Sequence, residues 1–192
     1  MFPFPFEETI VKAVFSAVSH ASFLKPVTVF LGSVAPWIAG AWFTLSIARA
    51  KSFKLKFYYF ALAALGIIIS RGIITETAYN FFYIPRPFEF FDMAPVIPHA
   101  FKSGMPSGHM ALLTPLAFTF ILMRRKSGFV AGAAIIAIGM ARIAGGVHWM
   151  SDIAAGMLVG AAGFFIAKAI LPKKLSIGYS EPAEIDEPKR LV

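Results

Sequence analysis

Apolar residues along the chain gather into blocks whose lengths match membrane-crossing helices, and polar or basic residues separate the blocks. The blocks cover residues 27–48, 57–78, 107–123, 128–147 and 151–171. A helix needs about 20 apolar residues to cross a hydrocarbon core of about 30 Å. The pattern therefore predicts an all-α, polytopic membrane helix bundle with about five spanning helices, in a domain over residues 1–175.

Both ends of the chain depart from this pattern. Residues 8–24 mix apolar and polar positions. Ile10 and Val14 recur there at helical spacing with Lys12 between them, which is typical of an amphipathic helix at the membrane interface. Residues 176–192 are polar and rich in proline and glutamate, so we expect a flexible C-terminal tail.

The composition agrees with a membrane protein and narrows the function classes. Of the 192 residues, 58% are hydrophobic and 15% are charged, whereas a soluble domain carries about 25% charged residues. The net charge of +8 lies in clusters beside the apolar blocks, which favours a topology signal over a nucleic-acid partner. The absence of cysteine excludes disulfides, thiolate zinc sites and a thiol nucleophile.

The basic clusters predict the orientation of the chain in the membrane. They follow the first block at Arg49–Lys56, the third block at Arg124–Lys126 and the last block at Lys173–Lys174. By the positive-inside rule these clusters are cytoplasmic, and the C-terminus with them. The loop over 79–106 and the turn over 143–151 then share the extracytoplasmic face.

Candidate chemistry lies near that face, first at His148 and Asp152. A spacing of four residues on a helix lets the Asp152 carboxylate accept a hydrogen bond from imidazole Nδ1. The other ring nitrogen, Nε2, is then free to act as a nucleophile or a base. The alternative is a helix-capping aspartate beside an interfacial histidine.

Cations and backbone donors near the same face are suited to a phosphate. Arg142, late in the fourth block, and Arg86, between two prolines, carry guanidinium groups that pair well with phosphate oxygens. The segment Pro106-Ser107-Gly108-His109 opens a helix, where free N–H groups form an anion site and the histidine can protonate a leaving oxygen. Such a site needs no metal, and the arginines would repel one. Taken singly, each residue also fits a structural role at the interface.

Arg71 and Glu76 are ionisable residues late in the second block. Groups of this kind at membrane depth are usually paired or functional. A separation of five residues does not place them squarely on one face of an α-helix. Pairing with each other, snorkelling to the interface and a functional role all remain open for them.

Three motifs together resemble the signatures of the type 2 phosphatidic acid phosphatase superfamily, K-x6-R-P, P-S-G-H and S-R-x5-H-x3-D. In this chain they fall on Arg86-Pro87, on Pro106-Ser107-Gly108-His109, and on Arg142 with His148 and Asp152. The resemblance implies a helical, metal-independent membrane phosphatase that works through a phosphohistidine and uses no cofactor.

The resemblance also implies a role for each matched residue. His148 would be the nucleophile, Asp152 would orient it, and His109 would be the general acid. The phosphate would be held by Arg86, Arg142, Ser107 and the Gly108 backbone.

Two positions depart from the superfamily pattern. The motif lysine falls on Tyr79, and the serine before Arg142 is Ala141. One phosphate-binding cation and one hydroxyl are therefore missing. We consider two substitutes for them: the hydroxyl of Tyr79 and the ammonium group of Lys102.

Within the superfamily, Arg86-Pro87-Phe88 followed by Pro98-His99 resembles bacterial undecaprenyl-diphosphate phosphatases of the bacitracin-resistance type. This implies a bacterial inner-membrane protein with an extracytoplasmic site and a lipid phosphate as substrate. Phosphatidylglycerophosphate, phosphatidic acid and lipid A phosphatases share these motifs and are the alternatives. An alternative of another class is a non-catalytic protein of the same fold that binds or transports lipid phosphates.

Overall fold

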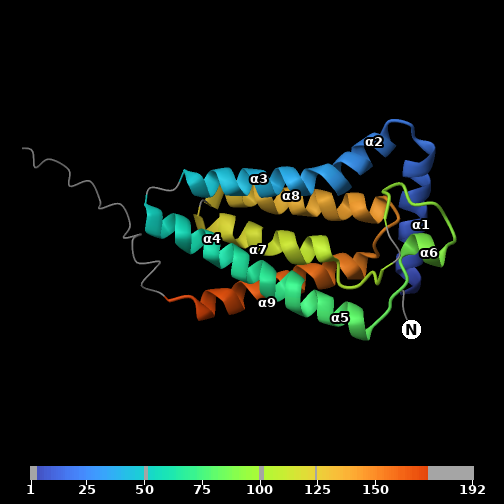
Figure 1. Cartoon of the computed structure of the whole chain (residues 1–192). Helices are drawn as coiled ribbons and strands as arrows, with labels where there is room; N and C mark the ends of the chain where they lie inside the picture. Colours follow the sequence, from blue (N-terminus) through green and yellow to red (C-terminus); the bar gives the residue numbers. More distant parts are fainter. Residues whose placement is uncertain (1–3, 50–51, 100–101, 124, 173–192) are drawn as a thin grey trace, which may run out of the picture.

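The computed structural model describes residues 4–49, 52–99, 102–123 and 125–172, and all regular structure in these ranges is helical. The expected flexible tail over 176–192 lies outside the described residues. Long helices run side by side along one direction, and short elements cross one end of the bundle (Figure 1).

Within the described ranges, five helical stretches form the bundle, close to the five apolar blocks in the sequence. The first two are continuous across π-helical segments, where the backbone hydrogen bonds span five residues. Their elements are α2 (Leu24–Val29), η1 (Phe30–Val34) and α3 (Ala35–Ala48), then α4 (Phe53–Ile67), η2 (Ile68–Thr75) and α5 (Glu76–Phe81). The others are α7 (Gly108–Met123), α8 (Arg125–Ala144) and α9 (Met150–Ile170).

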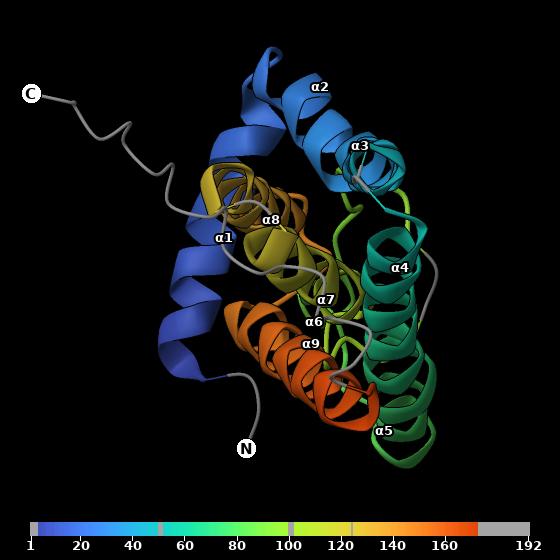
Figure 2. The ribbon, with the colours of Figure 1, turned by 90° about the vertical axis from the view of Figure 1, so that its left-hand side faces the viewer.

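Helix α7 lies at the centre of the bundle, with α3, α4, α8 and α9 around it (Figure 2). Its side chains contribute much of the buried core, including Met110, Leu113 and Phe120, which are each 2% exposed or less. Among the described residues, the stretches Leu24–Ala48, Phe53–Phe81 and Met150–Ile170 are long and apolar enough to cross a membrane. The prediction of an all-α membrane bundle is confirmed.

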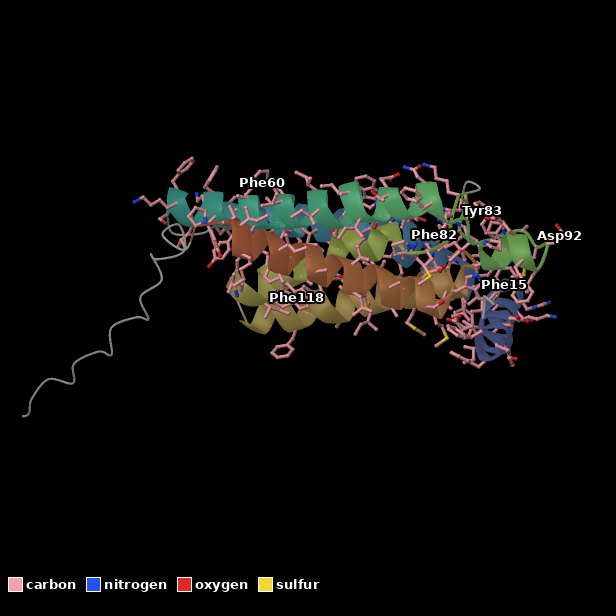
Figure 3. The ribbon with its side chains drawn as sticks, turned by 90° about the horizontal axis from the view of Figure 1, so that it is seen from below. Phe15, Phe60, Phe82, Tyr83, Asp92 and Phe118 are labelled. Carbon is pink, nitrogen blue, oxygen red and sulfur yellow. The ribbon has the colours of Figure 1, made fainter. Side chains whose placement is uncertain are left out.

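The outer surface of the bundle is apolar. Trp37, Leu158 and Phe60 are 79%, 72% and 60% exposed, and Figure 3 shows Phe60 on the outer side of α4. Phe82 and Tyr83 lie at the far end of the same stretch, beside the short elements (Figure 3). Such a surface is stable against lipid tails, and aromatic rings near one end are typical of a membrane interface.

The N-terminal helix α1 (Pro5–His20) crosses the end of the bundle instead of running along it (Figures 1 and 2). This orientation agrees with an interfacial helix. Its buried face matches the predicted apolar stripe only in part. Val18 is buried as the helical spacing predicts, but Val11 and Glu7 also face inward, and Ile10 is 42% exposed. Glu7 accepts hydrogen bonds from the backbone and hydroxyl of Ser151, at 2.6 and 3.0 Å, which ties α1 to the first turn of α9.

Small residues let α9 approach its neighbours closely. A Cβ at Gly160 would lie 2.6 Å from the Thr114 Cβ of α7, and one at Gly163 would lie 2.6 Å from the Gly66 carbonyl oxygen. Contacts this short do not fit a methyl group unless the helices move apart.

Replacing Gly160 with alanine is therefore expected to destabilise the bundle by about 1–3 kcal/mol, the usual cost of overpacking. Thermal unfolding in detergent measures this as a melting temperature lowered by several degrees. The matched control is Gly132→Ala, because no atom lies within 4 Å of the added methyl group there. Equal melting temperatures for the two variants would contradict the packing described.

Candidate active site

The sequence-predicted residues converge on a cavity at the end of the bundle crossed by α1. The cavity has a volume of about 390 Å³, and its lining includes Tyr79, Arg86, Lys102, Gly108, His109, Arg142 and His148. Ser107 and Asp152 are fully buried and contact His148 from behind the cavity wall. A larger, more apolar groove of about 780 Å³ lies between α1, α2 and residues 93–96, and it holds none of these groups.

His148 is held by hydrogen bonds on both sides of its ring. Its Nδ1 lies 3.1 Å from Asp152 Oδ2, so an ionised carboxylate keeps the proton on Nδ1. Its Nε2 lies 3.2 Å from Arg86 Nη1 and 3.3 Å from the Ser107 hydroxyl. The ring is 1% exposed. Burial lowers the pKa of His148 well below its usual 6.5, and the charges of Arg142 and Arg86 lower it further, so the imidazole is neutral at neutral pH.

The contact between His148 and Asp152 arises from a helix cap, which differs from the predicted pair on one helix face. Helix α9 begins at Met150, with Trp149 as its N-cap, so His148 lies before the helix. Asp152 Oδ2 accepts the Trp149 N–H at 2.9 Å, and the same oxygen faces the imidazole. The two predicted roles of Asp152, helix cap and partner of the histidine, therefore belong to the same carboxylate oxygen.

Arg86 is anchored by backbone carbonyl groups. Its Nη1 donates to Val147 at 2.7 Å, its Nε to Lys102 at 2.9 Å and its Nη2 to Ser103 at 3.0 Å. The flanking Pro85 and Pro87 restrict the backbone that presents it. Burial lowers the pKa of this guanidinium from its usual value. The arrangement fixes a desolvated positive charge beside His148.

Arg142, on α8, is 2% exposed, and only some of its N–H groups have hydrogen-bond partners. Its Nη1 donates to the Gly32 carbonyl of η1 at 2.9 Å. Its Nε and Nη2 have no hydrogen-bond partner within the described part of the chain. Pro36 lies four residues after Gly32 and has no N–H to donate to that carbonyl. A buried guanidinium with free N–H groups beside a cavity is suited to an anion.

The segment Pro106-Ser107-Gly108-His109 stands at the start of α7, where the sequence predicted the opening of a helix. The helix begins at Gly108, so Pro106 and Ser107 precede it. The Ser107 N–H donates to the Asp152 carbonyl at 2.9 Å, and therefore points away from any bound phosphate. The Ser107 hydroxyl faces His148 Nε2 at 3.3 Å, and the backbone N–H of Gly108 is directed toward the Tyr79 hydroxyl.

The two substitutes considered for the missing motif groups lie at the cavity. The Tyr79 hydroxyl donates to the Pro106 carbonyl at 2.8 Å, so its proton is already engaged. Lys102 is exposed, and its backbone carbonyl accepts from Arg86. Its role in phosphate binding stays a hypothesis, which unchanged activity in Lys102→Ala would exclude.

Two residues that line the cavity were not predicted from the sequence to be site residues. Arg71 lines the cavity together with His109 and Arg142. His99 also lines it, and its ring centroid lies 6.3 Å from that of His148. Burial, and then the charge of Arg86, lowers the pKa of His99 to about 4. His99 stands one residue after Pro98 in the run that suggested the subfamily, which is the one sequence signal that pointed to it.

Arg71 and Glu76 form an ion pair even though five residues separate them. The pair is possible because Arg71 lies in the π-helical segment η2, where positions five apart are neighbours along the helix. In a regular α-helix the two side chains would lie on different faces, so the spacing alone did not predict this proximity. Of the possibilities left open, the structure shows the pairing.

Comparison with known proteins shows the family to which the chain belongs. The model of the PAP2 superfamily matches residues 60–176, which is more than half of the chain and includes every motif. The chain belongs to the PAP2 superfamily. This confirms the resemblance drawn from the motifs, and the protein is an integral membrane protein of that superfamily.

The chain is similar in sequence to two curated relatives and in fold to one solved structure. It is 35% identical over 65 residues to the bacitracin transport permease protein BcrC of Bacillus licheniformis, covering 34% of this chain and 32% of that one. It is 28% identical over 124 residues to the lipid A 1-phosphatase of Rhizobium johnstonii, covering 61% and 50%. The matches thus span about a third to a half of these relatives.

The crystal structure of Aquifex aeolicus LpxE superposes on the PAP2 chain with a TM-score of 0.70. The alignment covers 86% of this chain and 96% of that one at 18% identity. At this identity the likeness shows a shared fold.

Proposed function

We propose that this PAP2 protein is a lipid phosphatase that removes the terminal phosphate of an isoprenoid diphosphate, undecaprenyl diphosphate in particular, through a phosphohistidine at His148. The observation that carries the proposal is the environment of the imidazole. Asp152 binds Nδ1, while Nε2 is directed toward Arg86 and Ser107 at a cavity where Arg142 has free donors.

In the first step, Nε2 of neutral His148 attacks the terminal phosphorus. The N–P bond forms as the bond to the bridging oxygen breaks. His109, which takes up a proton when the anionic diphosphate enters the cavity, gives that proton to the leaving lipid monophosphate. Arg86 and Arg142 stabilise the charge on the transferred phosphoryl oxygens. Asp152 stabilises the positive charge that forms on the imidazole.

In the second step, water hydrolyses the phosphohistidine. Neutral His109 takes a proton from the water as its oxygen attacks phosphorus. The N–P bond breaks, the electron pair returns to Nε2, and inorganic phosphate leaves. Each histidine ends in its starting protonation state, so the cycle balances.

The choice of a diphosphate rests on the resemblance of Arg86-Pro87-Phe88 and Pro98-His99 to undecaprenyl-diphosphate phosphatases and on the charges at the cavity. One relative is named for bacitracin transport and another as a lipid A 1-phosphatase, so lipid A is the principal competing substrate. Buried Arg86 and Arg142 lie inside the cavity, and the more exposed Arg71 and Lys102 also line it. These positive charges exceed what a single phosphate requires and suit a diphosphate better.

A substrate panel assayed in detergent tests the assignment. We expect kcat/KM for undecaprenyl diphosphate to exceed that for lipid A, phosphatidic acid and phosphatidylglycerophosphate by at least about tenfold. A higher value for lipid A would move the assignment to lipid A phosphatases. Binding of the lipids without any phosphate release would favour the non-catalytic alternative.

We also propose that the reaction needs no metal ion. Arg86 and Arg142 already supply the positive charge that a metal would bring, and they repel a cation from His148. Phosphate release is expected to continue at an unchanged rate in excess EDTA. A strict dependence on Mg²⁺ would overturn the mechanism.

The cavity is proposed to face the extracytoplasmic side of a bacterial inner membrane, with the C-terminus in the cytoplasm. The last turn of α3 and the first turn of α4, beside which Arg49, Lys54 and Lys56 lie in the sequence, are at the opposite end of the bundle (Figure 1), and the positive-inside rule makes that end cytoplasmic. The chain has no cysteine, so single cysteines report topology directly. In intact cells, an impermeant maleimide should label Ala94→Cys, on the loop at the cavity end, but not Lys54→Cys. The reverse pattern would invert the topology.

A further inference from the structure

The superfamily pattern leaves a gap in the phosphate-binding cations of this chain. The position of the motif lysine is Tyr79, whose hydroxyl is engaged with the Pro106 carbonyl. The edge of the cavity formed by the first turn of α7 therefore lacks a cation from the expected position.

Arg71 fills this edge of the cavity. Its Nε lies 2.8 Å, and its Cδ 3.3 Å, from the point where a Cβ on Gly108 would stand. Only the absence of a side chain at Gly108 allows the guanidinium to lie there. The side chain is 32% exposed, so a ligand entering the cavity can reach it.

The π-helical segment η2 explains how a residue eight positions before Tyr79 reaches the same place. In an α-helix, eight residues at about 100° each leave two side chains about 80° apart. One extra residue accommodated in a π-helical turn reduces the difference to about 20°. The structure agrees, because Arg71 Cζ lies 5.8 Å from the centroid of the Tyr79 ring.

Glu76 holds Arg71 in this orientation without a large gain in stability. The two side chains are 32% and 46% exposed, and exposed ion pairs contribute about 0–1 kcal/mol. Arg71 also shares the cavity with Arg86 and Arg142, which repel it. A third guanidinium at one cavity is costly unless the cavity receives an anion.

We propose that Arg71 is the phosphate-binding cation that replaces the motif lysine in this chain, with Glu76 as its positioning residue. Arg71 contacts the oxygens of the phosphate transferred to His148, on the side of α7 where Gly108 and His109 lie. This inference rests on the proposed function, because it assigns Arg71 to the same reaction.

The experiment moves the cation back to the superfamily position. Arg71→Gln is expected to lower kcat/KM for phosphate release by about 100-fold, the usual effect of losing one transition-state donor. The double variant Arg71→Gln/Tyr79→Lys should recover at least about tenfold of that loss. Glu76→Gln should retain kcat and raise KM only a few fold, because it loosens the guanidinium but keeps its charge. Arg49→Gln, an exposed arginine at the opposite end of the bundle, should behave as the wild type.

Two results would overturn the inference. Full activity in Arg71→Gln would remove Arg71 from the site. Equal losses of activity and melting temperature in Arg71→Gln and Glu76→Gln, without recovery in the double variant, would make the pair purely structural. In both cases an inactive His148→Asn leaves the proposed function standing, whereas an active His148→Asn would reject the proposed function itself.

Discussion

Replacing His148 with asparagine is expected to lower the rate of phosphate release by at least about 10⁴-fold, because the covalent route loses its nucleophile. Substrate binding should change little, since Arg86 and Arg142 keep their backbone anchors at Val147, Lys102, Ser103 and Gly32. Phosphate release from purified variants and equilibrium binding of the lipid measure the two effects separately.

His20→Asn provides the matched control for this variant. His20 is exposed at the end of α1, and its Nδ1 lies 2.7 Å from the Ser16 carbonyl of the same helix. Its loss should leave both rate and binding unchanged. A His148→Asn protein that folds, binds the lipid and still releases phosphate at more than a few per cent of the wild-type rate would contradict the assignment.

Replacing Asp152 with asparagine is expected to reduce kcat by about 10²–10⁴-fold with little change in KM. The asparagine oxygen can still accept from the Trp149 N–H, so the cap of α9 survives. The negative charge that stabilises the imidazolium is lost, and the ring can take the other tautomer. Steady-state kinetics on the purified variant separate these two parameters.

The second variant, Asp152→Ala, removes the helix cap as well as the charge. It leaves the buried Trp149 N–H unpaired, which should cost about 1–3 kcal/mol of stability in addition to the lost activity. A melting temperature close to the wild type in Asp152→Asn and a lower one in Asp152→Ala would separate the charge from the cap. If Asp152→Asn kept wild-type kcat, the carboxylate would be a cap and nothing more.

The fold and much of the cavity could be predicted from the sequence because their signals are local or come from charge. Apolar blocks give the helices, and the basic clusters place the 79–106 loop and the 143–151 turn at the same end. Arg86, His109, Arg142 and His148 then share that end, and the structure brings them to one cavity.

The remaining features depend on contacts or backbone geometry that no local pattern encodes. The Gly32 carbonyl meets Arg142 across 110 positions, and Glu7 meets Ser151 across 144. The π-helical turn of η2 moves Arg71 onto the cavity, yet its sequence reads as an ordinary apolar helix. Glu7 precedes residues 8–24, where the amphipathic helix was predicted, so no local pattern pointed to its inward-facing position.

The central claim is a covalent phosphohistidine at His148, and trapping it is the most direct test. Purified enzyme would be mixed with undecaprenyl diphosphate labelled in its terminal phosphate, quenched within one turnover under alkaline conditions, digested and analysed by mass spectrometry. We predict a base-stable, acid-labile phosphoryl group on His148 in the wild type, and none in His148→Asn. Release of phosphate in the first turnover with no label on His148, or with the label on another residue, would contradict the account.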